Sequence, residues 1–285
     1  MTVGECYAKL RTQLEKAGCD SPAFDALCLL EDIGGVPRGQ LSGWFFRELS
    51  AERAIRLEQA GEERAAGRPL QYILGEWEFL SLTLSVGEGV LVPRPDTELL
   101  CETAAEWLRR SPDGRPAKVL DLCAGSGCVG IGLASLNPNV EVTAVELSAE
   151  AFPYLLRNIA RYPQYPVQAV RADVLKDEGQ FFGEYRMLLC NPPYIPREDL
   201  PGLMREVQHE PVMALDGGEG GGLLFYRAIA RNWLHKLMPG GFCAVEVGIG
   251  QAEAVAALWR ANGLRKVEIR NDLGGVARVV TGERL

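Results

Sequence analysis

The run of residues with the clearest chemical potential is Asn191-Pro192-Pro193-Tyr194. Two consecutive prolines fix φ and remove two backbone N–H groups, so this segment presents hydrogen-bond acceptors with no donors beside them. The Asn191 side-chain oxygen and the Pro192 carbonyl can each accept one N–H from a planar NH2 group, such as a carboxamide or an adenine amine. These two hydrogen bonds would orient the weakly nucleophilic nitrogen toward an electrophile, and Tyr194 can stack on the planar group. The structural alternative is a Pro-Pro turn that only ends a strand.

A second candidate site is the glycine-containing turn Cys123-Ala124-Gly125-Ser126-Gly127. It follows an apolar run at 119–122 and precedes an apolar helical pattern. Glycines let the backbone approach a ligand closely, and the first turn of a helix offers free N–H groups. A single turn of this kind can also bind a dinucleotide, or merely connect a strand to a helix. It lacks the three-glycine fingerprint of nicotinamide-binding domains, which disfavours a dehydrogenase.

Acidic residues stand at the ends of the next two apolar runs. Glu146 ends one of them, where its carboxylate can accept hydrogen bonds from both hydroxyls of a ribose. Asp173 ends the other, and it can face an adenine ring together with the Val174 backbone. Either acid alone is more often a solvated strand end. Three successive strand ends that open on one crevice predict a nucleoside-binding site.

These residues need a sheet that brings the ends of several strands together. We expect parallel strands over 118–122, 140–145, 167–172, 187–190 and 242–247. Helices are expected over 96–109, 129–136, 149–160, 223–237 and 252–261. Such alternation predicts an α/β domain, a mostly parallel sheet with helices on both faces, and the final strands 266–270 and 277–281 suit an antiparallel hairpin.

The first part of the chain shows helical periodicity instead. Helices are expected over 3–17, 21–33 and 50–66. The second should have Ser21 as its N-cap and Pro22 at its first helical position. Alternation at 80–84 predicts a hairpin within 72–86. The predicted domains are therefore a helical bundle at 1–70, a linker with a β-hairpin at 71–90 and the α/β domain at 91–285.

Composition argues against several classes of protein. The chain has 285 residues, of which 47% are hydrophobic and 24% are charged. This length and composition are sufficient for one large domain and one smaller domain. The eight cysteines form no Cys-x-x-Cys pair and there are two histidines, so we expect neither a metal site nor a disulfide framework. With no leader pattern and no apolar run near the roughly 20 residues of a membrane helix, we expect a cytoplasmic protein. The net charge of −8 disfavours tight, sequence-independent binding of nucleic acid.

With their flanking segments, these motifs resemble the HemK/PrmC protein-(glutamine-N5) methyltransferases, which modify class I peptide chain release factors. The resemblance covers nearly the whole chain, and its most specific part is Pro93-Arg94-Pro95-Asp96-Thr97-Glu98. The supporting segments are 68–73, 191–195, 210–211 and 214–218. The Asn-Pro-Pro-Tyr motif alone is shared with adenine-N6 methyltransferases of DNA and RNA. The resemblance implies a Rossmann-like class I S-adenosylmethionine-dependent methyltransferase domain with a seven-stranded sheet, preceded by a helical domain.

The resemblance also implies roles for individual residues. S-adenosyl-L-methionine, which leaves as S-adenosyl-L-homocysteine, would contact Cys123, Ala124, Gly125, Ser126, Gly127, Glu146, Asp173, Val174 and Asn191. The glutamine of a Gly-Gly-Gln loop on the release factor would be held by Asn191, Pro192, Pro193 and Tyr194, with Arg94 shaping the mouth. The catalytic residues among these would be Asn191, Pro192 and Tyr194. The chain departs from many members at Cys123-Ala124, where they have Gly-Thr, and from some at Glu146, where they have Asp.

Three alternative functions remain open at this point. They are methylation of a glutamine in a large-subunit ribosomal protein, adenine-N6 methylation of nucleic acid, and a non-catalytic adapter that binds release factors. The intact tetrapeptide disfavours an adapter, and the acidic net charge disfavours a nucleic-acid substrate. We expect a monomer whose helical domain helps to recognise the partner. The glycine-rich run 216–222 is expected to be a flexible turn before a helix, because its two acids argue against a phosphate loop.

Overall fold

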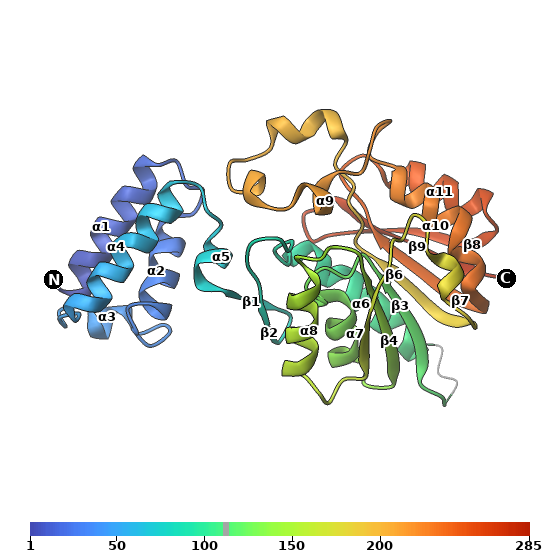
Figure 1. Cartoon of the computed structure of the whole chain (residues 1–285), viewed down its shortest axis with the longest axis horizontal. Helices are drawn as coiled ribbons and strands as arrows, with labels where there is room; N and C mark the ends of the chain where they lie inside the picture. Colours follow the sequence, from blue (N-terminus) through green and yellow to red (C-terminus); the bar gives the residue numbers. More distant parts are fainter. Residues whose placement is uncertain (111–113) are drawn as a thin grey trace. The chain divides into compact units, whose positions relative to one another are not determined.

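The computed structural model describes residues 1–110 and 114–285, which form two compact units (Figure 1). One unit comprises Met1–Glu76 and the short segment Met204–His209. The other comprises Trp77–Leu203 and Glu210–Leu285. Within the described residues, no helix combines the length and the apolar character that crossing a membrane requires.

The first unit is a bundle of helices. Its elements are α1 (Val3–Lys16), α2 (Pro22–Asp32), α3 (Leu41–Trp44), α4 (Ala51–Ala65), α5 (Leu70–Leu74) and the 3₁₀ turn η3 (Val207–His209). The three long helices confirm the predicted ones to within one residue at each end. Ser21 does precede α2, but its hydroxyl makes no capping hydrogen bond because its backbone (ψ 59°) is not extended. The short helices α3 and α5 escaped prediction because a single turn shows no 3.6-residue period.

A buried arginine joins three parts of this unit. Arg64 on α4 donates from Nε to Asp25 Oδ2 on α2 at 2.7 Å, and from Nη2 to Glu206 Oε2 at 2.6 Å. Both Arg64 and Asp25 are buried, and burial raises the pKa of Asp25 while the charge of Arg64 opposes that rise. Glu206 lies on the segment Met204–His209, which is far from the helices of the bundle in the sequence but belongs to the same unit. The ion pairs therefore fix that segment to the bundle.

Replacing Arg64 with alanine should destabilise the first unit by about 3 kcal/mol, because Asp25 is left buried with no opposite charge. Urea denaturation followed by circular dichroism measures this loss. Lys9→Ala is the matched control, since it breaks the exposed ion pair of Lys9 with Glu58 and should leave the midpoint unchanged. An Arg64→Ala midpoint equal to that of the parent protein would contradict the prediction.

The second unit is built on a seven-stranded sheet with the order β5-β4-β3-β6-β7-β9-β8. The strands are β3 (Ala117–Leu122), β4 (Val140–Glu146), β5 (Val167–Arg171), β6 (Tyr185–Cys190), β7 (Leu237–Glu246), β8 (Leu264–Asn271) and β9 (Ala277–Arg284). The first five are parallel, and β9 is antiparallel to both β7 and β8. This arrangement confirms the predicted parallel sheet and its closing antiparallel hairpin. A small separate sheet pairs β1 (Glu76–Phe79) with β2 (Leu82–Ser85), which confirms the predicted hairpin.

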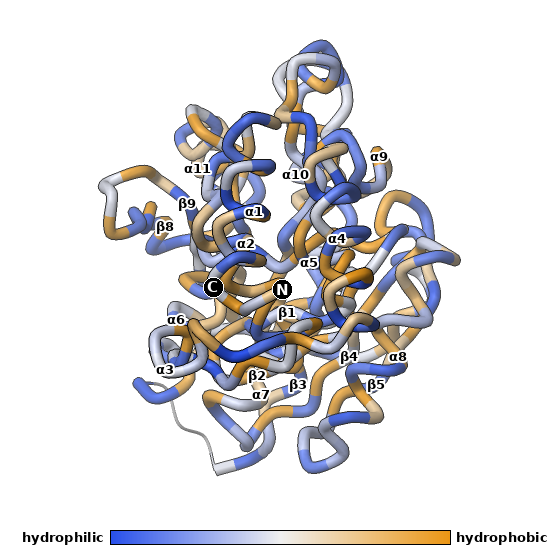
Figure 2. The backbone as a smooth tube through the Cα atoms, turned by 90° about the vertical axis from the view of Figure 1, so that its left-hand side faces the viewer, coloured by the Kyte–Doolittle hydropathy of each residue, from blue (hydrophilic) through white to orange (hydrophobic). Residues whose placement is uncertain are grey.

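Helices cover both faces of the seven-stranded sheet (Figure 1). They are α6 (Pro95–Arg110), α7 (Cys128–Leu136), α8 (Phe152–Arg161), α10 (Leu224–Asn232) and α11 (Ala252–Ala261). Val119 and Leu120 are neighbours on β3, yet Val119 packs with α6 and α7 while Leu120 packs with α10 and α11. The central strands are therefore apolar on both faces. Figure 2 colours the backbone by the hydropathy of each residue.

The predicted helix at 223–237 ends five residues early. Trp233 leaves the helical conformation, and its buried indole Nε1 donates to the carbonyl of Val174 at 2.8 Å. A 3₁₀ turn, η4 (Leu234–Lys236), follows, and β7 then begins at Leu237. The glycines and proline at 239–241 look like a turn in the sequence, but they lie at an irregularity within β7. The remaining short elements are η1 (Glu178–Gln180), η2 (Arg197–Gly202) and α9 (Val212–Leu215).

Candidate active site

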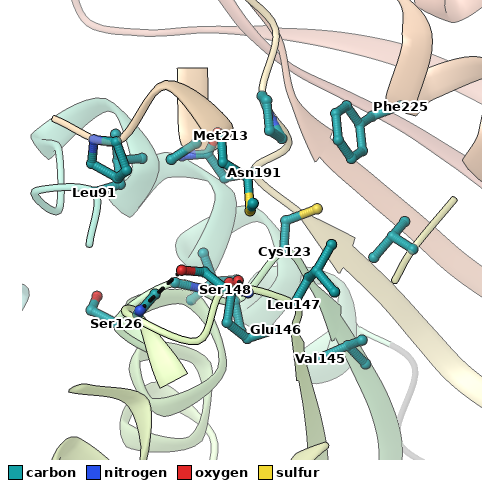
Figure 3. Close-up of a pocket in the computed structure, with 18 of the residues that line it drawn as sticks. Leu91, Cys123, Ser126, Val145, Glu146, Leu147, Ser148, Asn191, Met213 and Phe225 are labelled. Atoms are coloured by element: carbon teal, nitrogen blue, oxygen red, sulfur yellow. Dashed lines mark hydrogen bonds between the residues drawn. The ribbon is translucent and has the colours of Figure 1, made fainter. Parts of the chain in front are cut away.

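A pocket of about 300 Å³ lies where β3, β4, β5 and β6 end, within the second unit (Figure 3). Most of the predicted site residues line it, namely Arg94, Cys123, Ala124, Gly125, Ser126, Glu146, Asp173, Val174, Asn191 and Pro193. Among the described residues, the pocket lining does not include Gly127, Pro192 or Tyr194. The sheet order brings these segments together because β4, β3 and β6 are neighbours.

Two glycines of the turn after β3 have different structural roles. Gly125 has φ +55°, and a Cβ built on it would meet no atom within 4 Å. Its backbone therefore faces open space in the pocket, where a ligand can approach closely. Gly127 has φ +84°, and a Cβ there would lie 2.7 Å from Leu155 Cδ1 on α8. Packing between α7 and α8 requires that glycine.

Cys123 begins the same turn in a left-handed conformation, with φ +57°. A non-glycine residue in this conformation costs roughly 1 kcal/mol. The departure from the family resemblance at Cys123 therefore introduces local strain in the turn. The Cys123 thiol contributes a hydrogen bond that raises the pKa of the Cys190 thiol, after the larger effect of burial.

Glu146 at the end of β4 is fixed by backbone amides. Its Oε2 accepts from Gly125 N and its Oε1 from Ser148 N, both at 2.7 Å. Burial raises the pKa of Glu146, and these amide hydrogen bonds oppose the rise. The backbone of Leu147 also hydrogen-bonds to this carboxylate, which has about four acceptor positions, so acceptor capacity remains for a ligand. Two oriented acceptors at the pocket wall fit the two hydroxyls of a ribose.

Asp173 and Val174 follow β5 at another wall of the pocket. Asp173 Oδ1 accepts from Leu175 N at 2.9 Å, and its Oδ2 lies 3.1 Å from Lys176 Nζ. The Val174 carbonyl accepts from the Trp233 indole. These contacts hold the segment against the core beneath α10.

Asn191 emerges from the end of β6 and turns its side chain toward the pocket (Figure 3). Its Nδ2 donates to Thr97 Oγ1 on α6 at 3.1 Å, which directs the oxygen end of the amide away from Thr97. Pro192 is buried. The Tyr194 hydroxyl lies 3.4 Å from Glu246 Oε1 at the end of β7, and burial raises the pKa of Tyr194.

Glycines pack closely around Tyr194. A Cβ at Gly222 would lie 2.0 Å from the Tyr194 carbonyl oxygen, and one at Gly217 would lie 2.7 Å from its carbonyl carbon. Gln251 Nε2 donates to the carbonyls of both Tyr194 and Gly221, at 2.7 and 2.8 Å. The glycine-rich run does form the predicted turn before a helix, and these contacts show that two of its glycines also permit close packing against Tyr194.

Arg94 pairs with a residue that the sequence analysis did not assign to the site. Glu210 is 1% exposed in its side chain, forms an ion pair with Arg94 Nη2, and accepts from Val92 N at 3.0 Å. Residues on both sides of this contact line the pocket, including Leu91 and Pro211. The ion pair therefore connects two walls that are far apart in the sequence. Glu210-Pro211 within the family resemblance was the one signal that could have indicated it.

Comparisons with known proteins agree with this geometry. Residues 5–75 match the PrmC N-terminal domain, and residues 97–224 match the methyltransferase small domain. The release factor glutamine methyltransferase of Caulobacter vibrioides is 36% identical over 286 residues, which cover 99% of this chain and 96% of that protein. Its counterpart in Geobacter sulfurreducens is 38% identical over 278 residues, covering 95% and 93%. The chain belongs to the release factor glutamine methyltransferase family. 

Membership of the release factor glutamine methyltransferase family confirms the HemK/PrmC resemblance, and the class I fold has a structural counterpart. A solved methyltransferase from Pyrococcus furiosus has the same fold, with a TM-score of 0.53 at 17% identity, covering 82% of this chain and 99% of that one. The cofactor of the family is S-adenosyl-L-methionine, which supplies an electrophilic methyl group. The oriented Glu146 carboxylate and the open backbone at Gly125 fit its nucleoside.

Gly125→Val should lower the affinity for S-adenosyl-L-homocysteine at least tenfold, because the new side chain enters open pocket space in a left-handed backbone position. Isothermal titration calorimetry measures the affinity. Gly263→Val is the matched control: Gly263 also has positive φ and open surroundings, but it is exposed and does not line the pocket. Equal affinity in the two variants would contradict the role given to Gly125.

Asp121 is a buried acid on β3, just before the glycine-containing turn at 123–127. Its Oδ2 accepts from Gly130 N on α7 at 2.9 Å, while its Oδ1 has no hydrogen-bond partner within the described residues. Burial raises its pKa to about 7, and the Gly130 hydrogen bond opposes that rise. The folded protein therefore retains a proton on Asp121 up to a higher pH than the unfolded chain does.

The raised pKa predicts a pH-dependent stability difference. Asp121 binds more protons in the folded state between about pH 4 and pH 7, so its contribution to stability is present below this window and is lost as the pH rises through it. The stability of Asp121→Asn minus that of the parent protein should increase with pH across this window. Above the window the difference should stay constant. Thermal unfolding of both proteins at several pH values measures the difference, and a constant offset would contradict the prediction.

Proposed function

We propose that this chain transfers a methyl group from S-adenosyl-L-methionine to the side-chain amide nitrogen, N5, of the glutamine in the Gly-Gly-Gln loop of class I peptide chain release factors. The modification would modulate translation termination. The observation that carries this proposal is the Asn191 amide, which lines the nucleoside pocket while its nitrogen is bound to Thr97. Its oxygen is then available to accept an N–H from the substrate.

The proposed chemistry depends on acceptors alone. Asn191 Oδ1 and the Pro192 carbonyl would accept the two hydrogens of the glutamine NH2 and stabilise the positive charge that develops on its nitrogen. The paired prolines keep that acceptor position rigid. No strong base is needed, because the alkylated nitrogen is acidic enough to lose its proton to solvent. We assign Tyr194 to covering the planar group and excluding water.

We further assign positions to the remaining predicted site residues. The turn 123–127, Glu146, Asp173 and Val174 would hold the cofactor, with Glu146 on the ribose. Pro193 would line the substrate side, and Arg94 would shape the mouth through its ion pair with Glu210. No metal takes part in this mechanism.

The proposal also covers the organisation of the whole chain. Residues 1–70 would recognise the release factor, 71–90 would link the domains and 91–285 would carry the catalytic centre. The protein would act as a cytoplasmic monomer that does not bind nucleic acid tightly, in line with its net charge of −8.

A methyl-transfer assay tests the substrate. Incubation with S-adenosyl-L-methionine labelled in its methyl group should label an intact release factor, and replacement of the loop glutamine by alanine should abolish labelling. Equal labelling of both proteins would contradict the proposal. A large-subunit ribosomal protein and an adenine-containing RNA, assayed in parallel, separate the two alternative enzyme functions. Calorimetry with S-adenosyl-L-methionine separates the adapter, which would show no affinity for it.

Asn191→Ala should lower kcat by about 100-fold, the effect expected from removing one preorganised polar group from a transition state. Its affinity for the cofactor should change by less than about twofold. Steady-state kinetics and calorimetry measure the two quantities. Asn262→Ala, which removes an exposed asparagine at the end of α11, is the control and should keep full turnover. Undiminished kcat in Asn191→Ala would refute the mechanism.

A further inference from the structure

The amide of Asn191 can act as an acceptor only if its oxygen faces the substrate. We propose that Thr97 and Glu246 are positioning residues that fix this orientation. The proposal rests on the function assigned to Asn191 above, and it gives a role to two side chains that do not contact the substrate in that mechanism. The proposal concerns which group donates and which accepts in the hydrogen bonds that link Asn191, Thr97 and Glu246.

The three side chains come from separate elements, and two of them, Thr97 and Asn191, line the pocket. Thr97 lies in the first turn of α6 and is 1% exposed, and its Oγ1 accepts from Asn191 Nδ2 at 3.1 Å. Glu246 ends β7 and is also 1% exposed, and hydrogen bonding by the Thr97 side chain is one of the influences that lower its pKa. Thr97 and Asn191 are 94 residues apart in the sequence. The contact is therefore a product of the fold.

A threonine hydroxyl has one hydrogen and two lone pairs, so it can donate only once. We infer that Thr97 donates to the Glu246 carboxylate, which can only accept, so Thr97 offers Asn191 a lone pair. Asn191 must then place its NH2 group toward Thr97 and its oxygen on the other side. An ionised carboxylate accepts but cannot donate, and this property sets the direction of all three groups.

Other groups around Glu246 support its role as an acceptor. The Tyr194 hydroxyl also donates to Glu246 Oε1, and Arg278 on β9 lowers the pKa of Glu246. Asp96 opposes that effect, and burial, the largest influence, raises the pKa to about 7. Oε2 has no hydrogen-bond partner within the described residues. At pH 8.5 the carboxylate is ionised and accepts from both hydroxyls.

Loss of the acceptor would free the Thr97 proton. Thr97 could then donate to Asn191 Oδ1, and the amide could rotate so that its NH2 group faces the pocket. Two NH2 groups would then oppose each other, and the substrate nitrogen would lose one of its two acceptors. The expected defect is therefore in turnover, while the cofactor contacts at Gly125 and Glu146 stay intact.

Thr97→Val tests the proposal because it keeps the shape of the side chain and removes the hydroxyl. At pH 8.5 it should lower kcat by about tenfold, the size expected for one hydrogen bond in a transition state, with cofactor affinity unchanged. Thr97→Ser retains the hydroxyl and should stay within about twofold of the parent kcat. Parent-like turnover in Thr97→Val, or an equal loss in Thr97→Ser, would overturn the proposal.

A double-mutant cycle separates positioning from a general structural defect. In single-turnover assays, Thr97→Val should cause no further loss once Asn191 is alanine, because there is no amide left to orient. An additive tenfold loss would overturn the proposal. The same assays measure the turnover of Asn191→Ala by itself. Parent-like turnover of that variant would defeat the proposed mechanism, whereas additive losses would defeat only the positioning role of Thr97.

Glu246→Met provides a second test that does not require the threonine variant to fold. It removes the acceptor while keeping a side chain of similar length, and thermal unfolding checks that the fold is retained. It should also lower kcat by about tenfold with unchanged cofactor affinity, and Thr97→Val should add little to it. Parent-like turnover in a folded Glu246→Met protein would overturn the assignment of Glu246.

Discussion

A primary amide has an accepting end and a donating end of nearly equal size, and the mechanism proposed for this site depends on which end of the Asn191 amide faces the pocket. At Asn191 the donating end is bound to Thr97, so the accepting end is available. A methyl acceptor that carries two hydrogens needs two oxygens and no donors around it. The two prolines have no backbone N–H groups, so they add no donors. The hydrogen bond to Thr97 occupies the NH2 group of Asn191, which leaves its oxygen as an acceptor.

The sheet order converts these local constraints into one site. Neighbouring strands β4, β3 and β6 end at the same edge, so Glu146, the turn at 123–127 and Asn191 meet without long loops. Two energetically unfavourable features lie at this edge of the sheet. Cys123 has a left-handed backbone and Asp121 is a buried acid, and both features lie at the turn to which we assign the cofactor.

The sequence predicted the sheet and the three long helices of the bundle, because continuous apolar runs and 3.6-residue periods are local signals. It also indicated Gly125, Glu146 and Asn191, since each follows directly from its own strand. It could not indicate contacts between distant segments. Thr97 with Asn191 and Glu210 with Arg94 become visible only when the chain is folded. The close packing of Gly217 and Gly222 against Tyr194 could not be predicted for the same reason, because Tyr194 lies elsewhere in the sequence.

The contact between Arg94 and Glu210 joins residues 116 positions apart, and it closes one wall of the pocket. During synthesis, this wall of the pocket cannot form until the chain has been made beyond residue 210, although Arg94 and the turn at 123–127 are made much earlier. A chain that ended before Glu210 would therefore lack the partner of Arg94, and this side of the pocket would stay unclosed.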